Sequence, residues 1–373
     1  MKIGIITIHY GVNYGSALQA YALTRFLNEN GFDAEIINYI PKRYRITPYF
    51  SSSKKNYLLK IVFIIARAPI LFLHRKVFYD FLKKYVPLSK LYKTDDKIYK
   101  ENFKYDVFIT GSDQVWNKDY NGETQDIYYL NFAPKGAIKI SCSASFGKSD
   151  ITDKKELMEI NKVLKNYKAI SIRENSGLKI LYKAGIKNAV QVLDPTFLYN
   201  RDTWKKHFKT KRLIQEPYIL IYALDGEEEK LINYSNLIAK MKGYKTALLS
   251  VANKKQHRSR VDYCFRNKSP EYFIELFSNA SYIVTNSFHG VAFSINFEKQ
   301  FVAVSRKAYN SRLESILNMF NLIHRLINRT SSNLDLNTAL SEINYSKIRS
   351  LIEEQRNKLN SFLMNNLKLN HKE

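Results

Sequence analysis

Short apolar runs alternate along the chain with longer segments in which apolar residues recur at helical spacing. Residues 2–8 (KIGIITI) form a continuous apolar run that is typical of a buried strand. Residues 16–31 then place apolar side chains three and four positions apart and end in Gly31, which is typical of a helix. A further apolar run covers 32–39, so this segment predicts a strand, a helix and a parallel strand.

The same alternation continues to residue 199 and restarts after a polar, basic stretch at 200–216. Before this stretch, the pattern predicts strands over 105–111, 138–147, 168–174 and 189–199, and helices over 153–166 and 176–185. After it, the pattern predicts strands over 218–226, 246–251 and 281–290, and helices over 227–241, 271–280 and 344–367.

These elements predict an α/β protein of two doubly wound, Rossmann-like domains that face one another across a cleft. We assign residues 1–205 to an N-terminal α/β domain, 206–335 to a C-terminal α/β domain and 336–373 to a C-terminal helical tail. The chain has 373 residues, more than one typical hydrophobic core needs, which also favours two domains.

A basic, apolar insertion at about 42–100 interrupts the first domain. Its most apolar part, 54–85, contains Lys60, Arg67 and Pro69, which break any apolar span long enough to cross a membrane. We therefore expect one or two amphipathic helices, divided near Pro69. Such helices either pack onto the core or contact an anionic membrane surface, and the sequence leaves both interpretations open.

The net charge of the chain is strongly positive, at +25. Residues 41–104 hold 16 lysines and arginines against 4 acidic residues. Such a surface attracts anionic small molecules, anionic membranes or nucleic acid. The first residues lack the features of a signal peptide, and Cys142 and Cys264 form no C-x-x-C pair, so we expect a cytoplasmic protein without disulfides.

Polar residues suited to chemistry recur at one place in this pattern, the carboxyl end of a predicted strand. In an open parallel sheet these ends lie along the crevice that binds ligands. Five segments share this position: Gly11–Ser16, Ser112–Gln114, Ser143–Gly147, Arg173–Asn175 and Asn286–Gly290. Their common position favours a binding site over five unrelated turns.

The first of these segments contains Gly11, Asn13, Gly15 and Ser16. Its glycines permit close approach of the backbone, and the helix that begins near Ser16 directs free N–H groups at the loop, as in anion sites. A tight turn without a ligand is the alternative. The loop lacks the G-x-G-x-x-G pattern and the second strand does not end in an acid, so we do not expect a nicotinamide dinucleotide.

Two charged residues stand out at the next strand ends. Arg173 presents a rigid guanidinium that suits a carboxylate or a phosphate, with a buried pair to Glu174 or another acid as the alternative. Asp113 either orients a sugar hydroxyl, acts as a base or caps the segment that follows it. The sequence does not separate these roles.

His289 is the candidate for proton transfer, because the ordinary pKa of histidine lies near neutrality. It lies between Ser287 and Gly290 at a predicted strand end, where a structural histidine is less expected. His9, beside the first loop, is the rival candidate. The common zinc and Walker motifs are missing from the sequence, so we expect no metal dependence.

Five segments in this order resemble the polysaccharide pyruvyl transferase family: GVNYGSALQAYAL, YDVFITGSDQVWN, SIRENSG, VLDPTFLY and TNSFHGVAFSI. The resemblance extends from residue 3 to about 330, and GSDQVWN and SFHG are its most specific parts. It implies a fold similar to the two-domain GT-B glycosyltransferases. It also implies transfer of the pyruvyl group of phosphoenolpyruvate onto two hydroxyls of a sugar as a cyclic ketal, with release of phosphate.

The resemblance further implies roles for single residues. His289 matches the family's histidine, which we expect to be the general acid and base, and Arg173 matches its donor-binding arginine. We expect the donor site to contain Arg173, Ser287, Gly290 and Arg312. We expect the sugar acceptor to bind near Gly11, Asn13, Gly15, Ser16, Asp113 and Gln114.

One departure from the family pattern concerns the donor site. Many members have an arginine where this chain has Ser287, so a cation expected near the phosphate has to come from elsewhere. Arg312 is the first candidate, and Arg306 and Lys307 are the others.

The resemblance also bears on partners and location. It implies phosphoenolpyruvate as co-substrate, no resident cofactor, and a role in making a capsule, an exopolysaccharide or an O-antigen. The acceptor would then be a lipid-linked oligosaccharide at the inner face of the cytoplasmic membrane, where the basic 54–85 segment would contact anionic lipid.

Two other function classes remain as alternatives. A GT-B glycosyltransferase would use a nucleotide-sugar donor, for which the sequence shows no clear base-binding signature. A binder of nucleic acid would fit the positive charge, but no recognition motif is present and the polar strand ends would have no role. We therefore do not expect nucleic acid as a partner.

Overall fold

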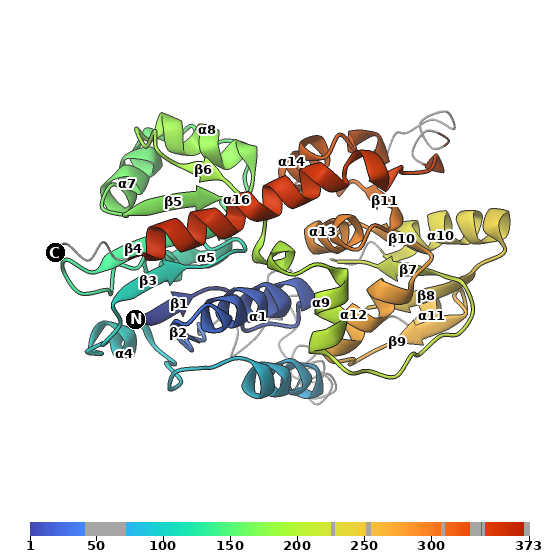
Figure 1. Cartoon of the computed structure of the whole chain (residues 1–373), viewed down its shortest axis with the longest axis horizontal. Coiled ribbons are helices and arrows are strands. Elements are labelled where there is room, and N and C mark those ends of the chain that lie inside the picture. Colours follow the sequence, from blue (N-terminus) through green and yellow to red (C-terminus); the bar gives the residue numbers. More distant parts are fainter. Residues whose placement is uncertain are drawn as a thin grey trace, which may run out of the picture.

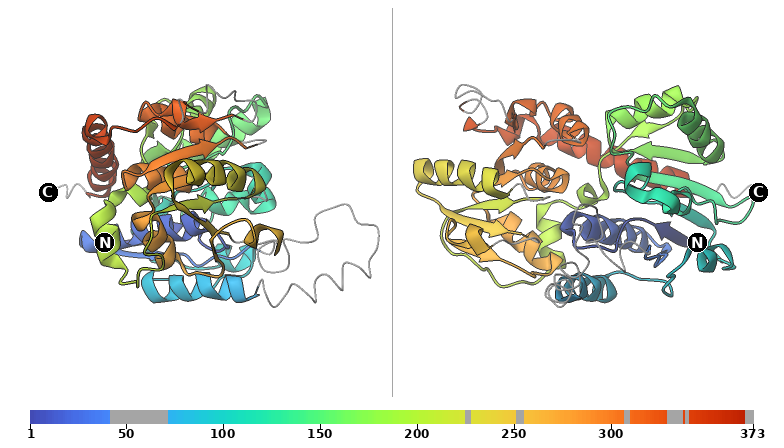
Figure 2. Two further views of the ribbon diagram at one scale, coloured as in Figure 1. Left: turned by 90° about the vertical axis from the view of Figure 1, so that its right-hand side faces the viewer. Right: turned by 180° about the vertical axis from the view of Figure 1, so that it is seen from behind.

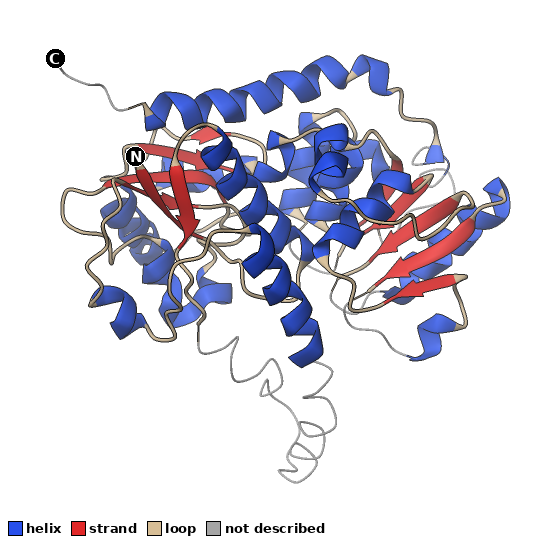
Figure 3. Cartoon of the chain, turned by 60° about the horizontal axis from the view of Figure 1, so that its bottom comes forward, coloured by secondary structure: helices blue, strands red, loops and turns tan. Residues whose placement is uncertain are grey.

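A computed structural model describes residues 1–41, 72–224, 228–250, 255–306, 310–328, 337 and 340–368 (Figure 1). Within these residues the chain forms two six-stranded sheets in which all neighbouring strands are parallel. Figure 3 shows the sheets as two separate sets of strands, with helices around and between them. The predicted α/β class with two doubly wound units is confirmed.

The first sheet has the strand order β2-β1-β3-β4-β5-β6. Its strands are β1 (Lys2–Ile6), β2 (Asp33–Ile36), β3 (Val107–Thr110), β4 (Ile138–Ala144), β5 (Ala169–Ile172) and β6 (Val190–Gln191). The helical elements of this part are α1 (Tyr14–Glu29), a helix over 72–85, α4 (Asp95–Tyr99), α5 (Lys118–Asn121), η1 (Gly122–Thr124), α6 (Gln125–Tyr128), α7 (Lys154–Leu164), α8 (Asn175–Lys183), η2 (Pro195–Leu198) and α9 (Arg201–His207).

The second sheet has the order β12-β11-β10-β7-β8-β9. Its strands are β7 (Tyr218–Tyr222), β8 (Lys245–Leu249), β9 (Tyr263–Phe265), β10 (Tyr282–Thr285), β11 (Gln300–Val304) and β12 (Leu326–Ile327). The remaining helical elements are α10 (Glu228–Lys242), α11 (Lys255–Arg258), α12 (Pro270–Asn279), α13 (Phe288–Asn296), α14 (Ser311–Met319), η3 (Ile323–Arg325), η4 (Tyr345–Lys347) and α16 (Arg349–Leu367).

Each sheet has one point at which the strand order changes direction. In the first sheet this point lies between β1 and β3, and in the second it lies between β7 and β10. Loops that follow the strands on either side of such a point separate and leave a crevice for ligands. The loop before Ser16 follows β1, Asp113 follows β3 and His289 follows β10, so these candidates lie at the two switch points.

Two of the predicted strands are wrong over most of their length. Over 189–199 only β6 is a strand, because Pro195 begins the helical turn η2 and the Asp194 carboxylate accepts the N–H of Thr196. Over 281–290 the strand ends at Thr285 and α13 follows. A continuous apolar run such as VAFSI fits a buried helix as well as a strand, so periodicity alone does not separate them.

Much of the predicted insertion, at 42–71, lies outside the described residues. The described helix over 72–85 buries Phe78, Phe81 and Leu82, and the Phe78 ring lies 4.9 Å from the ring of Tyr14 in α1. This helix, light blue at the bottom of Figure 1, therefore packs onto the core through one face. None of the described helices is long and apolar enough to span a membrane.

Helix α16 connects the two parts of the molecule. It runs from the second sheet back over the first (Figures 1 and 2) and buries Ile352, Leu359 and Leu363 in the largest core cluster. Arg356 donates to the carbonyl oxygen of Phe197 at 2.8 Å and to Asn296 Oδ1 at 2.8 Å. Since that core cluster draws residues from both sheets, the two units share one apolar interior.

Candidate active site

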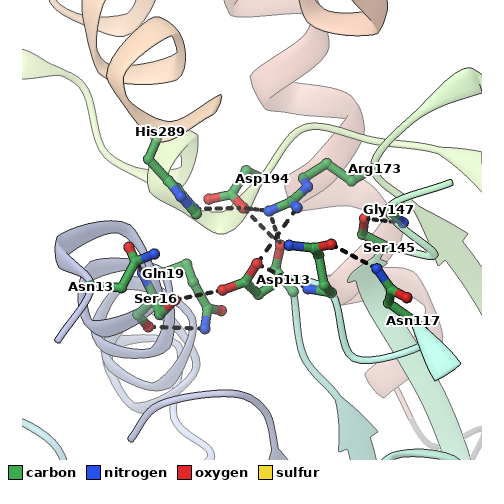
Figure 4. Close-up of polar contacts among 12 residues, drawn as sticks. Asn13, Ser16, Gln19, Asp113, Asn117, Ser145, Gly147, Arg173, Asp194 and His289 are labelled. Carbon is green, nitrogen blue, oxygen red and sulfur yellow. Dashed lines mark hydrogen bonds and ion pairs between the residues drawn. The ribbon is translucent and has the colours of Figure 1, made fainter. Parts of the chain in front are cut away.

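The loops after β1 and β3 meet at the first switch point (Figure 4). Ser16, in the first turn of α1, donates its hydroxyl to Asp113 Oδ2 at 2.5 Å. Asn13 caps the helix, because its Oδ1 accepts the N–H of Ser16 at 3.3 Å, and Gln19 donates to the carbonyl oxygen of Ser16 at 3.0 Å. Asp113 has a φ of 77°, a conformation that few residues other than glycine adopt and that often marks functional loops.

The structure brings His289 of the second unit directly against this cluster. His289 lies in the first turn of α13 and is only 4% exposed. A Cβ added to Gly15 would lie 2.0 Å from both Cγ and Nδ1 of the His289 ring. Glycine is needed at position 15 because any side chain there would overlap the imidazole that α13 of the second unit places against the start of α1.

The neighbours of His289 serve the packing of α13. Ser287 is the N-cap residue of this helix, and its N–H donates to Thr285 Oγ1 at 3.1 Å. A Cβ at Gly290 would lie 2.1 Å from the same oxygen, so the missing side chain makes room for Thr285 rather than for a ligand. The amino-terminal end of α13, where backbone N–H groups are free of helical partners, thus lies beside His289.

Arg173 follows β5 and lies between the two units, where only 4% of its surface is exposed. Its Nη1 donates to Asp194 Oδ2 at 3.1 Å, its Nη2 lies 3.7 Å from Asp113 Oδ1, and its guanidinium carbon lies 4.1 Å from the centre of the Phe288 ring. Two of its nitrogens, Nε and Nη2, have no hydrogen-bond partner among the described residues. Its Nε also lies 4.0 Å from Glu174 Oε2, so Arg173 forms ion pairs with three acids, including the Glu174 pair considered as the alternative to a ligand, and hydrogen-bonds to the described residues only through Nη1.

Asp194 links these groups, and the sequence did not single it out. Its Oδ2 accepts the hydroxyl of Ser112 at 2.7 Å and lies 3.5 Å from His289 Nε2, and its Oδ1 accepts the N–H of Thr196 at 3.0 Å. Burial alone would raise the pKa of Asp194, but the charge of His289, its hydrogen bond and the charge of Arg173 hold that pKa well below its usual range. The carboxylate is thus charged and lies against both Arg173 and His289.

Arg312 is the third basic group of the site. It lies in the first turn of α14, is 8% exposed, and forms no hydrogen bond or ion pair with the described part of the chain. Burial and the charge of Arg173 lower the pKa of Arg312 to about 10, although Asp113 acts in the opposite direction. The other two candidate cations for the donor site are Arg306 and Lys307. Arg306 follows β11 within the described residues, and Lys307 lies outside them.

The carboxylate of Asp113 is charged for a similar reason. Burial acts to raise its pKa, but the charges of Arg173 and His289 and the hydrogen bond from Ser16 lower that pKa below its usual value. Asp113 is therefore a hydrogen-bond acceptor, and one of its oxygens, Oδ2, accepts the hydroxyl of Ser16.

The remaining predicted acceptor residues lie in different surroundings. Gln114 Oε1 accepts from Asn117 Nδ2 at 2.8 Å and lies 2.3 Å from where a Cβ of Gly147 would be. Its amide is therefore held within the first unit. Gly11, in contrast, has no atom within 4 Å of its own added Cβ and lies beside open space.

His9, the rival of His289, is held within the first unit. Its Nδ1 lies 3.1 Å from the carbonyl oxygen of Thr7, its Nε2 lies 3.2 Å from Asn38 Oδ1, and burial lowers its pKa. Nε2 of His289, by contrast, faces Asp194 Oδ2 across the two units at 3.5 Å. The geometry therefore places His289, and not His9, among the charged groups of the candidate site.

The assembled site has two chemically different sides. The side at Arg173, Arg312 and the start of α13 offers donors and positive charge, which suit an anion with carboxylate or phosphate oxygens. The side at Ser16, Gln19 and Asp113 offers hydroxyl, amide and carboxylate groups, which suit hydroxyls. No cluster of histidine, cysteine, aspartate and glutamate that could hold a metal ion occurs among the described residues.

A family model described as polysaccharide pyruvyl transferase matches residues 13–307, a span that contains Asp113, Arg173, Asp194 and His289. The chain belongs to the polysaccharide pyruvyl transferase family. The resemblance expected from the sequence is thereby confirmed. A search of curated proteins found no significant match.

Solved structures show the same two-unit fold. UDP-GlcNAc 2-epimerase from Methanocaldococcus jannaschii aligns with a TM-score of 0.52 and 11% identity over 92% of this chain and 93% of that chain. The MnaA–UDP co-structure of S. aureus aligns with a TM-score of 0.51 and 12% identity over 99% and 98%. At such low identity these matches concern the fold alone, and they support the expected GT-B architecture of this pyruvyl transferase family member.

Two residues of the site escaped the sequence interpretation. Asp194 lies in the VLDPTFLY segment, which is one of the family motifs, but the segment was interpreted as a strand and its acid was not considered. The Asp-Pro pair, a frequent start of a turn, was the available signal. Gln19 lies one turn after Ser16 on a helix with a known start, so helical spacing could have placed it on the same face.

Replacement of Gly15 by alanine tests the contact with His289. We expect Gly15→Ala to lower the melting temperature, because the new Cβ displaces either the ring or α1, and overpacking of this kind costs about 1–3 kcal/mol. Gly11→Ala is the matched control in the same loop, with open space and an expected change within about 0.5 kcal/mol. Equal effects of the two changes in a thermal unfolding experiment would contradict the proposed contact.

Proposed function

We propose that the protein transfers the pyruvyl group of phosphoenolpyruvate onto two hydroxyls of a sugar as a cyclic ketal during the synthesis of a surface polysaccharide. The observation that carries this proposal is a pair of buried arginines: Arg312, which forms no hydrogen bond or ion pair with a described residue, and Arg173, which has two nitrogens without a hydrogen bond. Phosphoenolpyruvate has a carboxylate and a phosphate, so it needs two groups of cationic donors. Family membership supplies the reaction class.

The donor would lie between Arg173, Arg312 and the start of α13. Arg312 Nε has no partner among the described residues, and Arg173 Nε and Nη2 face Glu174 and Asp113 without forming a hydrogen bond, so an anion could accept hydrogen bonds from all three nitrogens. Arg312 in this role replaces the arginine that many family members have at the position of Ser287. The burial of both guanidinium groups strengthens their attraction for an anion, because little water screens the charge.

The reaction needs one proton at carbon 3 of the donor. We assign this proton to the His289 imidazole, which becomes neutral as carbon 2 becomes electrophilic. The first sugar hydroxyl adds to carbon 2 and loses its proton, the bond from carbon 2 to the phosphate oxygen breaks, and phosphate leaves with the electron pair. The second hydroxyl then attacks carbon 2 and closes the ketal. One hydroxyl proton restores the imidazolium and the other leaves with phosphate.

The sugar would bind at the first switch point. Ser16, Gln19 and Asp113 form one hydrogen-bonded group there. Asp113 is charged and can accept a hydrogen bond from a sugar hydroxyl. Asn13 would contribute through the helix start that it caps. The acceptor in this proposal is a lipid-linked oligosaccharide, the co-substrate is phosphoenolpyruvate, and no resident cofactor takes part.

Donor binding is tested first by thermal unfolding with phosphoenolpyruvate. We expect the ligand to raise the melting temperature of the wild type by mass action, and this rise to disappear in Arg312→Gln. Arg312 forms no ion pair with a described residue, so its loss affects binding more than folding. Arg201→Gln removes an arginine from an exposed pair with Asp202 and is the control that should keep the full rise.

The outcome also separates the proposal from the glycosyltransferase alternative. A rise with UDP or GDP and none with phosphoenolpyruvate would contradict pyruvyl transfer and favour a nucleotide-sugar donor. With a working acceptor in D₂O, pyruvyl transfer should give a ketal whose methyl group has one deuterium, because carbon 3 takes its proton from an exchangeable group. Mass spectrometry of the glycan measures this directly.

A further inference from the structure

The outer face of the helix over 72–85 exposes apolar and basic side chains together. Phe72 is 70% exposed and Leu73 is 49% exposed, in a chain whose large apolar side chains are mostly buried. Helical spacing places Lys76, Lys83 and Lys84 on the same face together with one acid, Asp80, and all four are exposed. This set, Phe72, Leu73, Lys76, Lys83 and Lys84, is called the outer face below.

The opposite side of the helix is fixed to the protein. Phe78, Phe81 and Leu82 are at most 3% exposed, and the Phe81 ring lies 6.0 Å from that of Tyr21 in α1. The helix therefore does not need the outer face for its own packing. A Phe and a Leu left in water are unfavourable unless a second apolar medium covers them.

The charges of the outer face indicate whether a lipid surface or a nucleic acid binds there. Lys76 pairs with Asp80 at 2.5 Å, while Lys83 and Lys84 lie over the rings of Tyr79 at 5.3 Å and Tyr85 at 4.7 Å. Apolar side chains at one end of a helix with lysines and tyrosines along it are typical of helices at a lipid interface, where lysine extends to the headgroups. A nucleic acid would attract the lysines but would give Phe72 and Leu73 no apolar partner.

We propose that the outer face of the helix over 72–85 binds the surface of an anionic lipid bilayer. Phe72 and Leu73 enter the headgroup region, and Lys76, Lys83 and Lys84 bind acidic headgroups. The net charge of +25 directs the protein to such a surface. This proposal deepens the proposed function, since Phe78 on the same helix lies 4.9 Å from Tyr14, which precedes Gly15 at the acceptor side.

The position of the helix would bring a membrane-bound acceptor close to the candidate acceptor site. Phe78 of this helix packs against Tyr14, so a lipid-linked sugar that emerges from the bilayer beside the helix would lie near Gly15 and Ser16 in the first turn of α1. The bilayer would thus concentrate the acceptor at the first switch point. Bilayer binding itself depends only on the outer face and not on the reaction.

Co-sedimentation of the full chain with vesicles tests the proposal. We expect the wild type to bind vesicles of phosphatidylcholine and phosphatidylglycerol in equal parts, and to bind pure phosphatidylcholine weakly. Phe72→Asp with Leu73→Asp should lower the partition coefficient by about tenfold or more, and Lys83→Glu with Lys84→Glu should lower binding only to the anionic vesicles.

The matched control replaces two equally exposed apolar residues elsewhere. Met158 on α7 is 71% exposed and Tyr182 on α8 is 65% exposed, and these helices lie at the opposite edge of Figure 1. Met158→Asp with Tyr182→Asp should leave vesicle binding unchanged. Equal losses in both double variants, no binding by the wild type, or binding to RNA without binding to vesicles would overturn the proposal.

A second readout separates this proposal from the proposed function. The rise in melting temperature with phosphoenolpyruvate should be the same in the wild type and in Phe72→Asp with Leu73→Asp, because the donor site lies at Arg173 and Arg312. Vesicle binding without any such rise in the wild type would contradict pyruvyl transfer and leave the bilayer surface supported. A rise in melting temperature with phosphoenolpyruvate but no vesicle binding would contradict the bilayer proposal and leave pyruvyl transfer supported.

Discussion

His289→Ala is expected to lower turnover of phosphoenolpyruvate by about 10²–10⁴-fold, the usual contribution of a general acid or base. Donor binding should change little, because Arg173 and Arg312, the proposed anion contacts, remain in place. The ring occupies a niche formed by Gly15, so its removal leaves a small cavity, and Asp194 keeps its ion pair with Arg173. Phosphate release with the acceptor that supports the wild type measures turnover, and the thermal shift with phosphoenolpyruvate measures binding.

His9→Gln is the control for this experiment. Glutamine keeps hydrogen-bonding groups near Asn38 and the carbonyl oxygen of Thr7, so we expect turnover close to that of the wild type. Loss of turnover in His9→Gln with normal turnover in His289→Ala would move the proton transfer to the end of β1.

Asp194→Asn is expected to destabilise the protein by about 3–5 kcal/mol, as the loss of one partner from a buried ion pair usually does. The carboxylate is fully buried and lies against Arg173 and His289, so a neutral amide leaves the buried Arg173 guanidinium without its nearest carboxylate. Denaturant unfolding at neutral pH gives the free energy difference. We also expect weaker donor binding, because Arg173 loses its orientation.

The pH dependence of this effect follows from the direction of the shift. The pKa of Asp194 is lower in the folded than in the unfolded chain, so its stabilisation is present above the unfolded pKa of about 4 and is lost as pH falls toward the folded value. The stability difference between wild type and Asp194→Asn should therefore be full at neutral pH and shrink below about pH 4.

An exposed ion pair provides the control for Asp194. Asp150 lies 2.6 Å from Lys183 Nζ with 43% of its side chain exposed, so Asp150→Asn should change the free energy of unfolding far less than Asp194→Asn. A similar cost for both variants would show that burial and the two cations add nothing at Asp194.

The two sheets could be predicted because the strands at their centres are short, nearly continuous apolar runs. Strands β1, β3, β7 and β10 are buried on both faces, and a parallel sheet covered by helices favours such sequences. The same property concealed α13, whose nine residues are all buried and therefore show no polar face. Helices of this kind have no amphipathic signal, so sequence pattern assigns them to strands.

The members of the site could be predicted better than their contacts. Polar residues at strand ends identified Asp113, Arg173 and His289, since the crevice of a doubly wound sheet is a property of topology. The contact of Gly15 with the His289 ring, in contrast, depends on how two sheets far apart in the sequence pack. Gly15 and Gly290 look alike in the sequence, and only the structure separates a niche for His289 from a niche for Thr285.

The path of α16 has a consequence for how the chain reaches its final form. The ribosome releases the first sheet, then the second, and only afterwards the helix whose Leu359 and Leu363 complete the apolar interior that both sheets share. Until that moment the nascent protein has an uncovered seam along η2 and α13. Synthesis rate and chaperone access between the release of the second sheet and the release of α16 would then affect how much of the protein escapes aggregation.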